Sequence, residues 1–329
     1  MFAWLLWPLS VLFALVVALR RRVLRTQAQD RAVPVVVVGN LTVGGNGKTP
    51  VVMALAESLQ TRGWQVGVIS AGYGGAVHAT GAVCEVSAES TAEAVGDEPL
   101  LLARQTHVPV VIGRDRVAAA DFLLARYPAL DVVISDDGLQ HYRLPRAVEW
   151  VVMAADFGLG NGFLLPAGPL REGRRRLKSV QALLITGVGH AADAVSCRKV
   201  PRYRLPVQSD GAYLLSGEGW VEWAALAGQP CYLLTAIARG ERVREALAGK
   251  LDIIDALYLP DHARIDVQAA QFAGAQGWIV VTAKDAVKLD AWPQALRMRV
   301  LVVDYRVQLP PLLLDVLEEQ LRRWTPRLP

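Results

Sequence analysis

The chain has 329 residues, of which 53% are hydrophobic and 20% charged, so it is not intrinsically disordered and is long enough for two domains. The 35 basic and 31 acidic residues give a net charge of +4, which is too small by itself to indicate nucleic-acid binding. Three widely separated cysteines exclude a disulfide framework and a CxxC metal site, and they favour a reducing compartment. Few of the basic residues are lysines: Lys48, Lys178, Lys199, Lys250, Lys284 and Lys288.

The N-terminal segment is apolar. Residues 2–19 carry no charge, and as a helix they would span about 27 Å, at the short end of what crosses a hydrocarbon core. The basic group Arg20, Arg21, Arg22 and Arg25 follows the apolar run, which argues against a cleavable signal peptide and keeps the rest of the chain in the cytoplasm. We expect residues 1–25 to form a membrane-anchoring helix that either spans the bilayer or lies in its surface. A buried first helix of the soluble fold is the alternative.

The next segment alternates between β-branched runs and amphipathic stretches. This alternation predicts an α/β fold, in which helices sandwich a parallel sheet over residues 26–200. Residues 201–221 have a weaker, alternating pattern and are expected to be a connecting β ribbon. Residues 222–329 return to the α/β rhythm and are expected to be a smaller C-terminal α/β domain that ends in a helix. The expected strands of the larger domain are 33–38, 65–70, 108–113, 131–137, 148–155 and 182–187.

A glycine-rich loop follows the first of these strands. The segment 39–50 reads GNLTVGGNGKTP, which indicates a P-loop of the nucleoside triphosphatase type. Lys48 would reach the β- and γ-phosphates, and the Thr49 hydroxyl would bind Mg²⁺. Thr42 stands where the general motif has glycine. The expected nucleotide-binding residues are Thr42, Val43, Gly44, Gly45, Asn46, Gly47, Lys48 and Thr49.

Two adjacent carboxylates end another buried run. Asp136 and Asp137 follow Val132–Ser135, where a nucleoside triphosphatase needs an acidic partner for its metal ion. Two neighbouring carboxylates repel unless a cation neutralises them, so we expect both to bind Mg²⁺, directly or through water. Val43 replaces the signature lysine of the partition-type ATPases, and Thr282–Asp285 has the wrong spacing for a guanine-specific motif. An acidic turn without a ligand is the alternative.

The loop resembles the P-loop of the tetraacyldisaccharide 4′-kinases, in which Thr or Ser at the position of Thr42 is usual. The resemblance covers most of the chain, and it continues through the segments 70–74 (SAGYG), 96–99 (GDEP), 135–141 (SDDGLQH), 166–172 (PAGPLRE), 260–262 (PDH) and 282–288 (TAKDAVK). Each segment is weak alone, but six in the same order behind an apolar N-terminus are specific.

The resemblance implies a lipid kinase. It would transfer a phosphoryl group from ATP, with Mg²⁺, to the 4′-hydroxyl of a tetraacylated glucosamine disaccharide 1-phosphate. The product would be the tetraacylated lipid A precursor of lipopolysaccharide biosynthesis. The enzyme would act at the cytoplasmic face of the bacterial inner membrane, in contact with its lipids. Neither nucleic acid nor an obligate protein partner is expected.

The resemblance also suggests the catalytic residues. Asp97 would be the base that accepts the proton of the sugar hydroxyl, His262 would pair with it, and Lys48 would act on the phosphates. A helix-capping or first-turn role is the alternative for Asp97, because Glu-Pro and a helical run follow it.

Other polar side chains are expected near the phosphates or the substrate. Gln140 and His141 lie just after the acidic pair, and Arg114 and Arg171 follow a strand and a Gly-Pro loop. Both arginines suit phosphate binding, although surface ion pairs are the alternative. Two further residues are expected to line the site, Glu172 as a metal or substrate ligand and Tyr73 beside the lipid.

Two other functions remain open from the sequence. A membrane-tethered P-loop ATPase that drives a protein partner would have the same anchor and nucleotide site, but it would have no use for Asp97 paired with His262. A nucleotide-binding scaffold is disfavoured by the acidic pair after Ile134.

Overall fold

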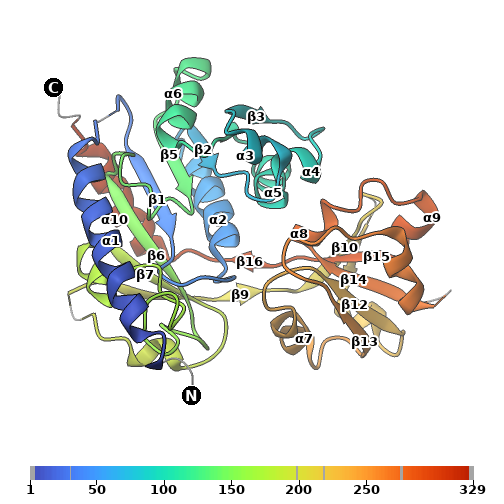
Figure 1. The fold of residues 1–329 in the computed structure, drawn as a ribbon. Coiled ribbons are helices and arrows are strands. Elements are labelled where there is room, and N and C mark those ends of the chain that lie inside the picture. The colour runs from blue at the N-terminus through green and yellow to red at the C-terminus, as the bar shows by residue number, and fades with distance from the viewer. Residues whose placement is uncertain (1–3, 30, 198, 218, 275–276, 326–329) are drawn as a thin grey trace.

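The computed structural model describes residues 4–29, 31–197, 199–217, 219–274 and 277–325. Two α/β domains lie side by side and are joined by a narrow two-stranded ribbon (Figure 1). The predicted arrangement of a parallel sheet between helices, with a smaller α/β domain beside it, is confirmed.

The larger domain is built on an eight-stranded sheet. Its strand order is β3-β4-β2-β5-β1-β6-β7-β8, and all neighbours are parallel except β3 and β4. Most of these strands are buried along their whole length, as expected for a sheet covered on both faces. The strands are β1 (Val35–Gly39), β2 (Val66–Ser70), β3 (Cys84–Val86), β4 (Val110–Ile112), β5 (Val132–Asp136), β6 (Val148–Ala154), β7 (Ala182–Thr186) and β8 (Arg202–Leu205).

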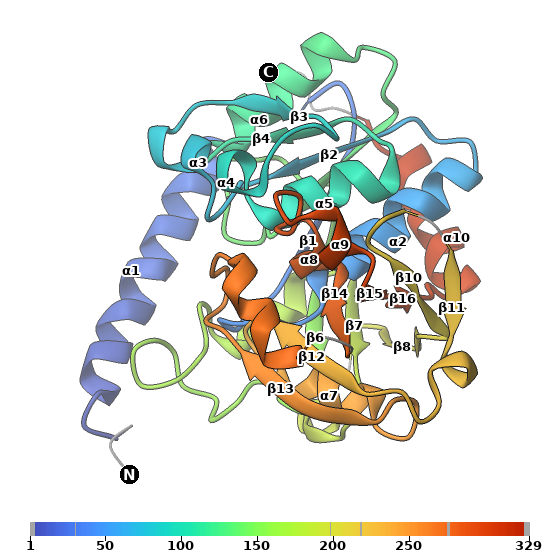
Figure 2. The same ribbon diagram turned by 90° about the vertical axis from the view of Figure 1, so that its right-hand side faces the viewer.

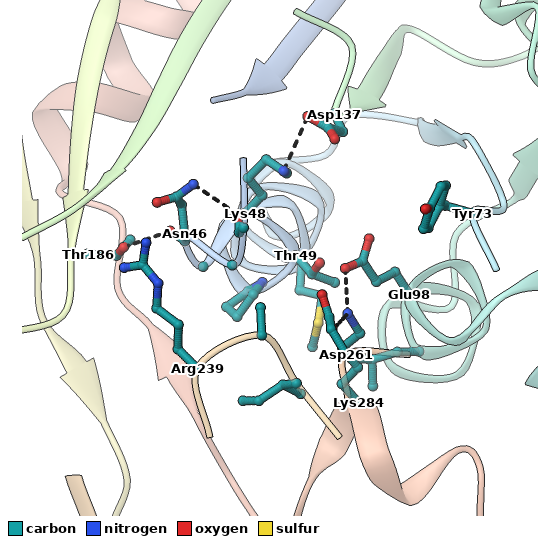
Figure 3. Close-up of a pocket in the computed structure, with 18 of the residues that line it drawn as sticks. Asn46, Lys48, Thr49, Tyr73, Glu98, Asp137, Thr186, Arg239, Asp261 and Lys284 are labelled. Atoms are coloured by element: carbon teal, nitrogen blue, oxygen red, sulfur yellow. Dashed lines mark hydrogen bonds and ion pairs between the residues drawn. The ribbon is translucent and has the colours of Figure 1, made fainter. Parts of the chain in front are cut away.

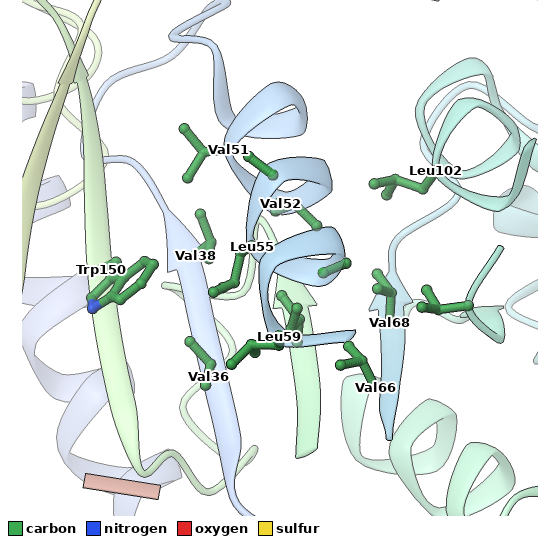
Figure 4. Close-up of a cluster of buried hydrophobic side chains, with 14 of the residues drawn as sticks. Val36, Val38, Val51, Val52, Leu55, Leu59, Val66, Val68, Leu102 and Trp150 are labelled. Carbon is green, nitrogen blue, oxygen red and sulfur yellow. The ribbon is translucent and has the colours of Figure 1, made fainter. Parts of the chain in front are cut away.

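The side chains of the central strand β1 pack into two hydrophobic cores of this domain, one on each face of the sheet. Its side chains alternate between the two faces of the sheet, because successive residues of a strand point in opposite directions. Val36 and Val38 pack under α2 (Lys48–Thr61), against Leu55 and its neighbours (Figure 4). Val35 and Val37 belong to the core on the other face. The other helical segments of this domain are α3 (Ala76–Thr80), α4 (Ala92–Val95), α5 (Asp97–Thr106), α6 (Arg116–Arg126), η2 (Arg174–Ser179) and η3 (Ala191–Ala194).

The smaller domain has a six-stranded mixed sheet in the order β11-β10-β15-β14-β12-β13. Its strands are β10 (Gly211–Leu214), β11 (Trp220–Glu222), β12 (Cys231–Thr235), β13 (Ile253–Tyr258), β14 (Trp278–Thr282) and β15 (Val300–Val303). Its helical segments are η4 (Trp223–Leu226), α7 (Glu241–Leu247), η5 (Val267–Ala273), α8 (Ala283–Ala286) and α9 (Gln294–Arg297).

The connection differs from the expected ribbon over residues 201–221. β8 joins the large sheet, whereas β10 and β11 belong to the small one. The ribbon itself is β9 (Val207–Gln208) paired antiparallel with β16 (Arg306–Val307), so one strand leaves the larger domain and the other returns to it. A short strand has the same alternation of apolar and polar residues in any sheet. The sequence therefore does not show which sheet β8, β10 and β11 join.

The C-terminal helix also differs from expectation, because it packs on the larger domain. α10 (Pro311–Arg322) places Leu313, Leu317 and Leu321 in the core under α2. An ion pair of 2.7 Å between Arg62 and Asp315 lies at the surface of this contact. The amphipathic pattern of α10 predicts a buried face but does not say which sheet it covers.

The N-terminal helix α1 (Trp7–Thr26) lies along one side of the larger domain (Figure 2). The sequence left a spanning and an interfacial helix open for residues 1–25, and among the described residues no helix is long and apolar enough to cross a membrane. The physical reason is that α1 begins only at Trp7 and carries its arginines from Arg20 onward. The uncharged part of α1 is therefore about 20 Å long, against a hydrocarbon core of about 30 Å. Residues 1–3 of the expected anchor lie outside the described residues.

Candidate active site

The P-loop joins the end of β1 to the start of α2. Gly44 and Gly47 have positive φ angles of 94° and 74°, a conformation that side chains with a Cβ rarely adopt. Thr42 is buried, and its hydroxyl accepts a hydrogen bond of 2.9 Å from the Asn46 amide. The same amide donates to the Gly44 carbonyl at 3.1 Å. Threonine in place of the consensus glycine therefore supplies an internal brace for the loop.

The loop lysine faces the acidic turn after β5. Lys48 Nζ lies 3.2 Å from Asp137 Oδ1, and Arg171 approaches the same carboxylate to 3.1 Å (Figure 3). Burial raises the pKa of Asp137, but Lys48 and Arg171 together bring it down to about 2. Three predicted site residues thus meet at one point, and Asp137 is ionised at neutral pH.

Asp136 lies one residue earlier, at the buried end of β5. Ser70 donates a hydrogen bond of 3.1 Å to its Oδ2, whereas its Oδ1 has no partner within the described part of the chain. Burial, together with Glu98 and Asp137, raises the pKa of Asp136 above its usual range. A buried carboxyl oxygen without a partner, in a region of unfavourable negative charge, is well suited to a cation.

The donor set near this point suits Mg²⁺. The Thr49 hydroxyl and the carboxylates of Asp136 and Asp137 are hard oxygen ligands, and Mg²⁺ commonly takes one or two carboxylates plus phosphate and water oxygens. No group of three or more His, Cys, Asp or Glu side chains among the described residues could hold a metal ion by itself. The nucleotide would therefore have to complete the coordination.

Glu172 has other partners. It is 2% exposed, and its two carboxylate oxygens accept hydrogen bonds from Gln140, at 3.0 Å, and from the hydroxyl of Tyr142. Gln140 also donates to the carbonyl of Asn40, at the start of the P-loop. Direct metal binding by Glu172 has no support in this geometry, which instead gives Glu172 the role of fixing Gln140. Tyr142 is a member of this network that the sequence analysis missed.

Asp97 and His262 come from different domains and meet in the structure. Asp97 begins α5, whereas His262 follows β13 in the smaller domain. His262 Nδ1 lies 2.9 Å from Asp97 Oδ1 and 3.0 Å from Oδ2. The helix cap is Gly96 rather than Asp97, although the amide of Glu98 also donates to Asp97 Oδ1 at 2.9 Å. The carboxylate thus serves the first turn of α5 and faces the histidine at the same time.

The charges around this pair keep Asp97 ionised. Burial raises the pKa of Asp97, but the hydrogen bond from His262 and the charges of Lys284 and Lys288 lower it to about 2. The hydrogen bond to Asp97 raises the pKa of His262 against the effect of burial. The pair therefore favours the carboxylate form of Asp97, and the contact makes the imidazolium form of His262 more favourable than in an isolated histidine.

Several charged residues near the site had no assigned role in the sequence analysis. Lys284 Nζ lies 2.8 Å from Glu98 and 3.5 Å from Asp261, and Lys288 Nζ lies 3.3 Å from Asp97. The sequence analysis considers their segment 282–288 for its resemblance and for its poor match to a guanine-specific motif, and gives neither lysine a role. The scarcity of lysines in the chain was the available signal for both lysines. The buried arginine Arg116 was also missed, and it donates to the carbonyls of Gly113 and Asp136.

One large cavity connects these groups. It has a volume of about 1860 Å³ and lies between the domains, with the P-loop on one side and residues of the smaller domain on the other. The five predicted substrate or phosphate contacts all line it: Tyr73, Arg114, Gln140, His141 and Arg171. Arg20 and Leu24 of α1 also line it, so the cavity reaches the N-terminal helix.

The side chains in this cavity differ in charge. Burial and the neighbouring Arg116 lower the pKa of His141 to about 3, so its ring is neutral and can contact phosphate only as a hydrogen-bond donor. Arg114 is exposed to the cavity and forms no ion pair with any described residue. Tyr73 is 63% exposed, and its ring packs edge-on against His262 with a centroid distance of 5.4 Å.

Known protein sequences match this chain over most of its length. The family model described as tetraacyldisaccharide-1-P 4′-kinase matches residues 2–322. The chain belongs to the tetraacyldisaccharide 4′-kinase family. Tetraacyldisaccharide 4′-kinase of Dichelobacter nodosus is 42% identical over 306 residues, which are 92% of this chain and 89% of the relative. The same enzyme of Chromobacterium violaceum is 43% identical over 320 residues, 93% of this chain and 90% of the relative.

A solved member of the tetraacyldisaccharide 4′-kinase family has the same fold. The crystal structure of LpxK from Aquifex aeolicus in complex with ATP superposes with a TM-score of 0.79 at 25% identity. The match covers 98% of this chain and 99% of that chain. The protein is therefore a kinase of this family, as the resemblance of its motifs predicts.

Proposed function

We propose that this kinase transfers the γ-phosphoryl group of ATP to the 4′-hydroxyl of a tetraacylated glucosamine disaccharide 1-phosphate. The observation that carries this proposal is the contact between Asp97 and His262, at 2.9 Å, beside the cavity that the P-loop lines. A base opposite a phosphate-binding loop is what transfer to a sugar hydroxyl requires. The acceptor, a tetraacylated disaccharide phosphorylated at its 4′ position, is inferred from the names of the relatives.

The proposed chemical step begins with a proton. As the hydroxyl oxygen forms a bond to the γ-phosphorus, its proton passes to the Asp97 carboxylate. The bond between the γ-phosphorus and the β–γ bridging oxygen breaks, and ADP keeps that electron pair. A carboxylate with a pKa of about 2 is a weak base. The loose transition state of phosphoryl transfer requires little proton removal before the new bond has formed, so positioning matters more than basicity.

The cations of the larger domain would bind the phosphates. Lys48 and Arg171 share Asp137, and an incoming triphosphate would compete for both of them. A bound Mg²⁺, held by Thr49, Asp136 and Asp137, would neutralise charge on the phosphates. Arg114 and the neutral His141 are placed to contact the phosphates or the acceptor from the cavity wall.

We also propose that α1 lies in the surface of the cytoplasmic leaflet of the inner membrane. Its outward face is apolar, and Leu12, Leu15 and Leu19 are 59%, 64% and 65% exposed. Trp4 and Trp7 are 72% and 48% exposed at its N-terminal end, and arginines occupy its C-terminal end. An amphipathic helix of this kind buries its apolar face at the boundary between headgroups and acyl chains. The cavity reaches α1, so a lipid acceptor could enter from that side.

A transfer assay tests the proposed function. Purified full-length protein in detergent micelles is given Mg²⁺, γ-labelled ATP and the tetraacylated disaccharide 1-phosphate, and the label is followed into the lipid. We expect the label in the lipid, with a strong loss in Asp97→Asn. Release of label only as inorganic phosphate, at a rate that does not depend on the lipid, would instead support an ATPase that drives a protein partner.

A further inference from the structure

Asp97 receives two contacts from the smaller domain, not one. His262 approaches it from the turn after β13, and Lys288 approaches it from the segment after α8. Lys288 Nζ lies 3.3 Å from Asp97 Oδ2, and the side chains of Lys288 and Asp97 are 6% and 3% exposed. The histidine and the lysine therefore enclose the carboxylate from two separate parts of the chain.

Lys288 is itself fixed by a buried carboxylate. Its ammonium lies 3.4 Å from Asp285 Oδ1 and 3.4 Å from the carbonyl oxygen of Ala236. Asp285 is fully buried and accepts hydrogen bonds of 2.7 Å from Thr235 and Thr282 and of 3.0 Å from the amide of Ala236. A lysine held in this way loses little further side-chain entropy when it meets Asp97.

Lys284 provides a natural comparison. It lies in α8, four residues before Lys288, which follows the end of this helix. Its shortest contact, however, is the 2.8 Å ion pair with Glu98 (Figure 3). It stays 3.9 Å from Asp97. Its side chain is 18% exposed, three times the fraction of Lys288. The two lysines carry the same charge, but Lys288 is the more deeply buried and is the one in close contact with the carboxylate.

We propose that Lys288 is a positioning residue for phosphoryl transfer, which bridges Asp285 and Asp97 and thereby holds the Asp97 carboxylate in the orientation that accepts the hydroxyl proton. This inference rests on the proposed function. In this proposal Lys284 has a different role: its ion pair with Glu98 joins the smaller domain to α5 in the wall of the cavity.

Loss of Lys288 would change the protonation and the orientation of the Asp97 carboxylate. A buried carboxylate that loses a charged partner either takes up a proton or turns toward its remaining donors. The amide of Glu98 contacts Oδ1 alone, whereas His262 contacts both oxygens and Lys284 stays 3.9 Å from Oδ2. Removal of Lys288 would therefore take from Oδ2 its closest cation of fixed charge and favour the protonated acid, which cannot accept a proton from the substrate. Other titratable groups near this point are Tyr73, His78, Glu98, Asp261, Lys284 and Asp285.

The experiment compares Lys288→Met, Lys288→Arg and Lys284→Met in full-length protein. Rates of lipid phosphorylation are measured against pH, with kcat and the KM for ATP determined separately. Removal of a residue that positions a catalytic group costs about 10–100-fold in activity. We expect Lys288→Met to lose kcat in that range with little change in the KM for ATP, and its acid limb to move to higher pH. Lys288→Arg should recover both kcat and the acid limb. Lys284→Met removes a charge that also lowers the pKa of Asp97, so it should move the acid limb too, but it should lose less kcat than Lys288→Met because Lys284 is not in close contact with the carboxylate.

The possible results distinguish a failure of the positioning role of Lys288 from a failure of the proposed function. If the unaltered protein phosphorylates the lipid and Lys288→Met keeps its kcat or its acid limb, the positioning role of Lys288 is overturned while the proposed function stands. The role is also overturned if Lys284→Met loses as much kcat as Lys288→Met. If the unaltered protein transfers no phosphate to the lipid, the proposed function fails and the inference fails with it. Thermal melts of the three variants show whether a loss of kcat reflects a loss of fold.

Discussion

The Lys48 ammonium and the Asp137 carboxylate lie 3.2 Å apart, so the cation of the P-loop pairs with the acidic turn of the neighbouring strand β5. The pairing brings together two groups that are both expected to act on the triphosphate. Each neutralises the other inside the protein, where an isolated charge would be costly. Nucleotide binding must therefore exchange this ion pair for contacts with phosphate and metal.

The first prediction is that Lys48→Met lowers kcat/KM for lipid phosphorylation by roughly 10²–10³-fold, as for removal of one preorganised donor at a charged transition state. Asp137 keeps Arg171 at 3.1 Å, so we expect the melting temperature to change little. Initial rates and a thermal melt measure the two effects. A variant of normal stability with normal kcat/KM would show that Lys48 does not act on the phosphates.

The second prediction is that Asp97→Asn keeps the fold but lowers kcat by about 10²–10⁴-fold, the usual contribution of a general base. Gly96 caps α5, so the asparagine removes no capping side chain. The decisive comparison is between kcat and the melting temperature. A large loss of melting temperature with normal kcat would assign Asp97 to the stability of α5 instead.

The sequence predicts those parts of the fold and the site that depend on local patterns. The buried β1 followed by glycines and Lys48 identifies the phosphate loop, and the carboxylates after Ile134 identify its acidic partner. The contact between Asp97 and His262 joins residues 165 positions apart, and family resemblance suggested it where spacing could not. Neither the spacing of residues nor the family resemblance predicts a role for Lys288, because that role depends on contact between the two domains.

The predictions that the structure corrects depend in the same way on features that a local sequence pattern does not determine. The pattern of α10 gives a buried face correctly but cannot say that Leu313 and Leu317 pack under α2. The apolar run at the N-terminus gives an exposed apolar helix but not its start at Trp7, which shortens it. The role of Glu172 as a metal or substrate ligand stays a prediction; in this structure its oxygens accept hydrogen bonds from Gln140 and Tyr142.

The third prediction concerns pH and stability. Asp97 has a folded-state pKa of about 2, below the ordinary value of 3.8. Its stabilising contribution is therefore present above pH 3.8 and is lost as the pH falls through about 2. The shift corresponds to roughly 2 kcal/mol of the free energy of unfolding. His262 has the opposite sign: its pKa is raised, so its contribution is present below pH 6.5 and is lost as the pH rises past its folded-state value.

Denaturant unfolding of the unaltered protein and of His262→Gln measures this effect. We expect the difference in unfolding free energy between them to be larger at pH 6 than at pH 9. A difference that grows with pH would mean that His262 does not gain a proton through Asp97.

The fourth prediction tests the outward face of α1 with Leu12→Ser combined with Leu19→Ser. Both leucines are exposed, at 59% and 65%, so the double variant should fold normally. Burying a leucine in an apolar environment contributes about 1.5–3 kcal/mol, so the loss of two should weaken binding to anionic vesicles by on the order of 10²-fold or more. Phosphorylation of lipid presented in vesicles should fall in parallel. ATP hydrolysis or binding in the absence of vesicles should not change.

Leu312→Ser is the matched control. Leu312 is 65% exposed on α10, which contributes to the same core as α2 and is not part of the outward apolar face of α1. It therefore removes an equally exposed leucine without touching the proposed contact with the bilayer. We expect it to bind vesicles like the unaltered protein in a sedimentation assay. Equal losses in the control and the double variant would mean that general surface hydrophobicity, and not α1, determines binding. Unchanged binding in the double variant would rule out this face of α1 as the contact with the membrane.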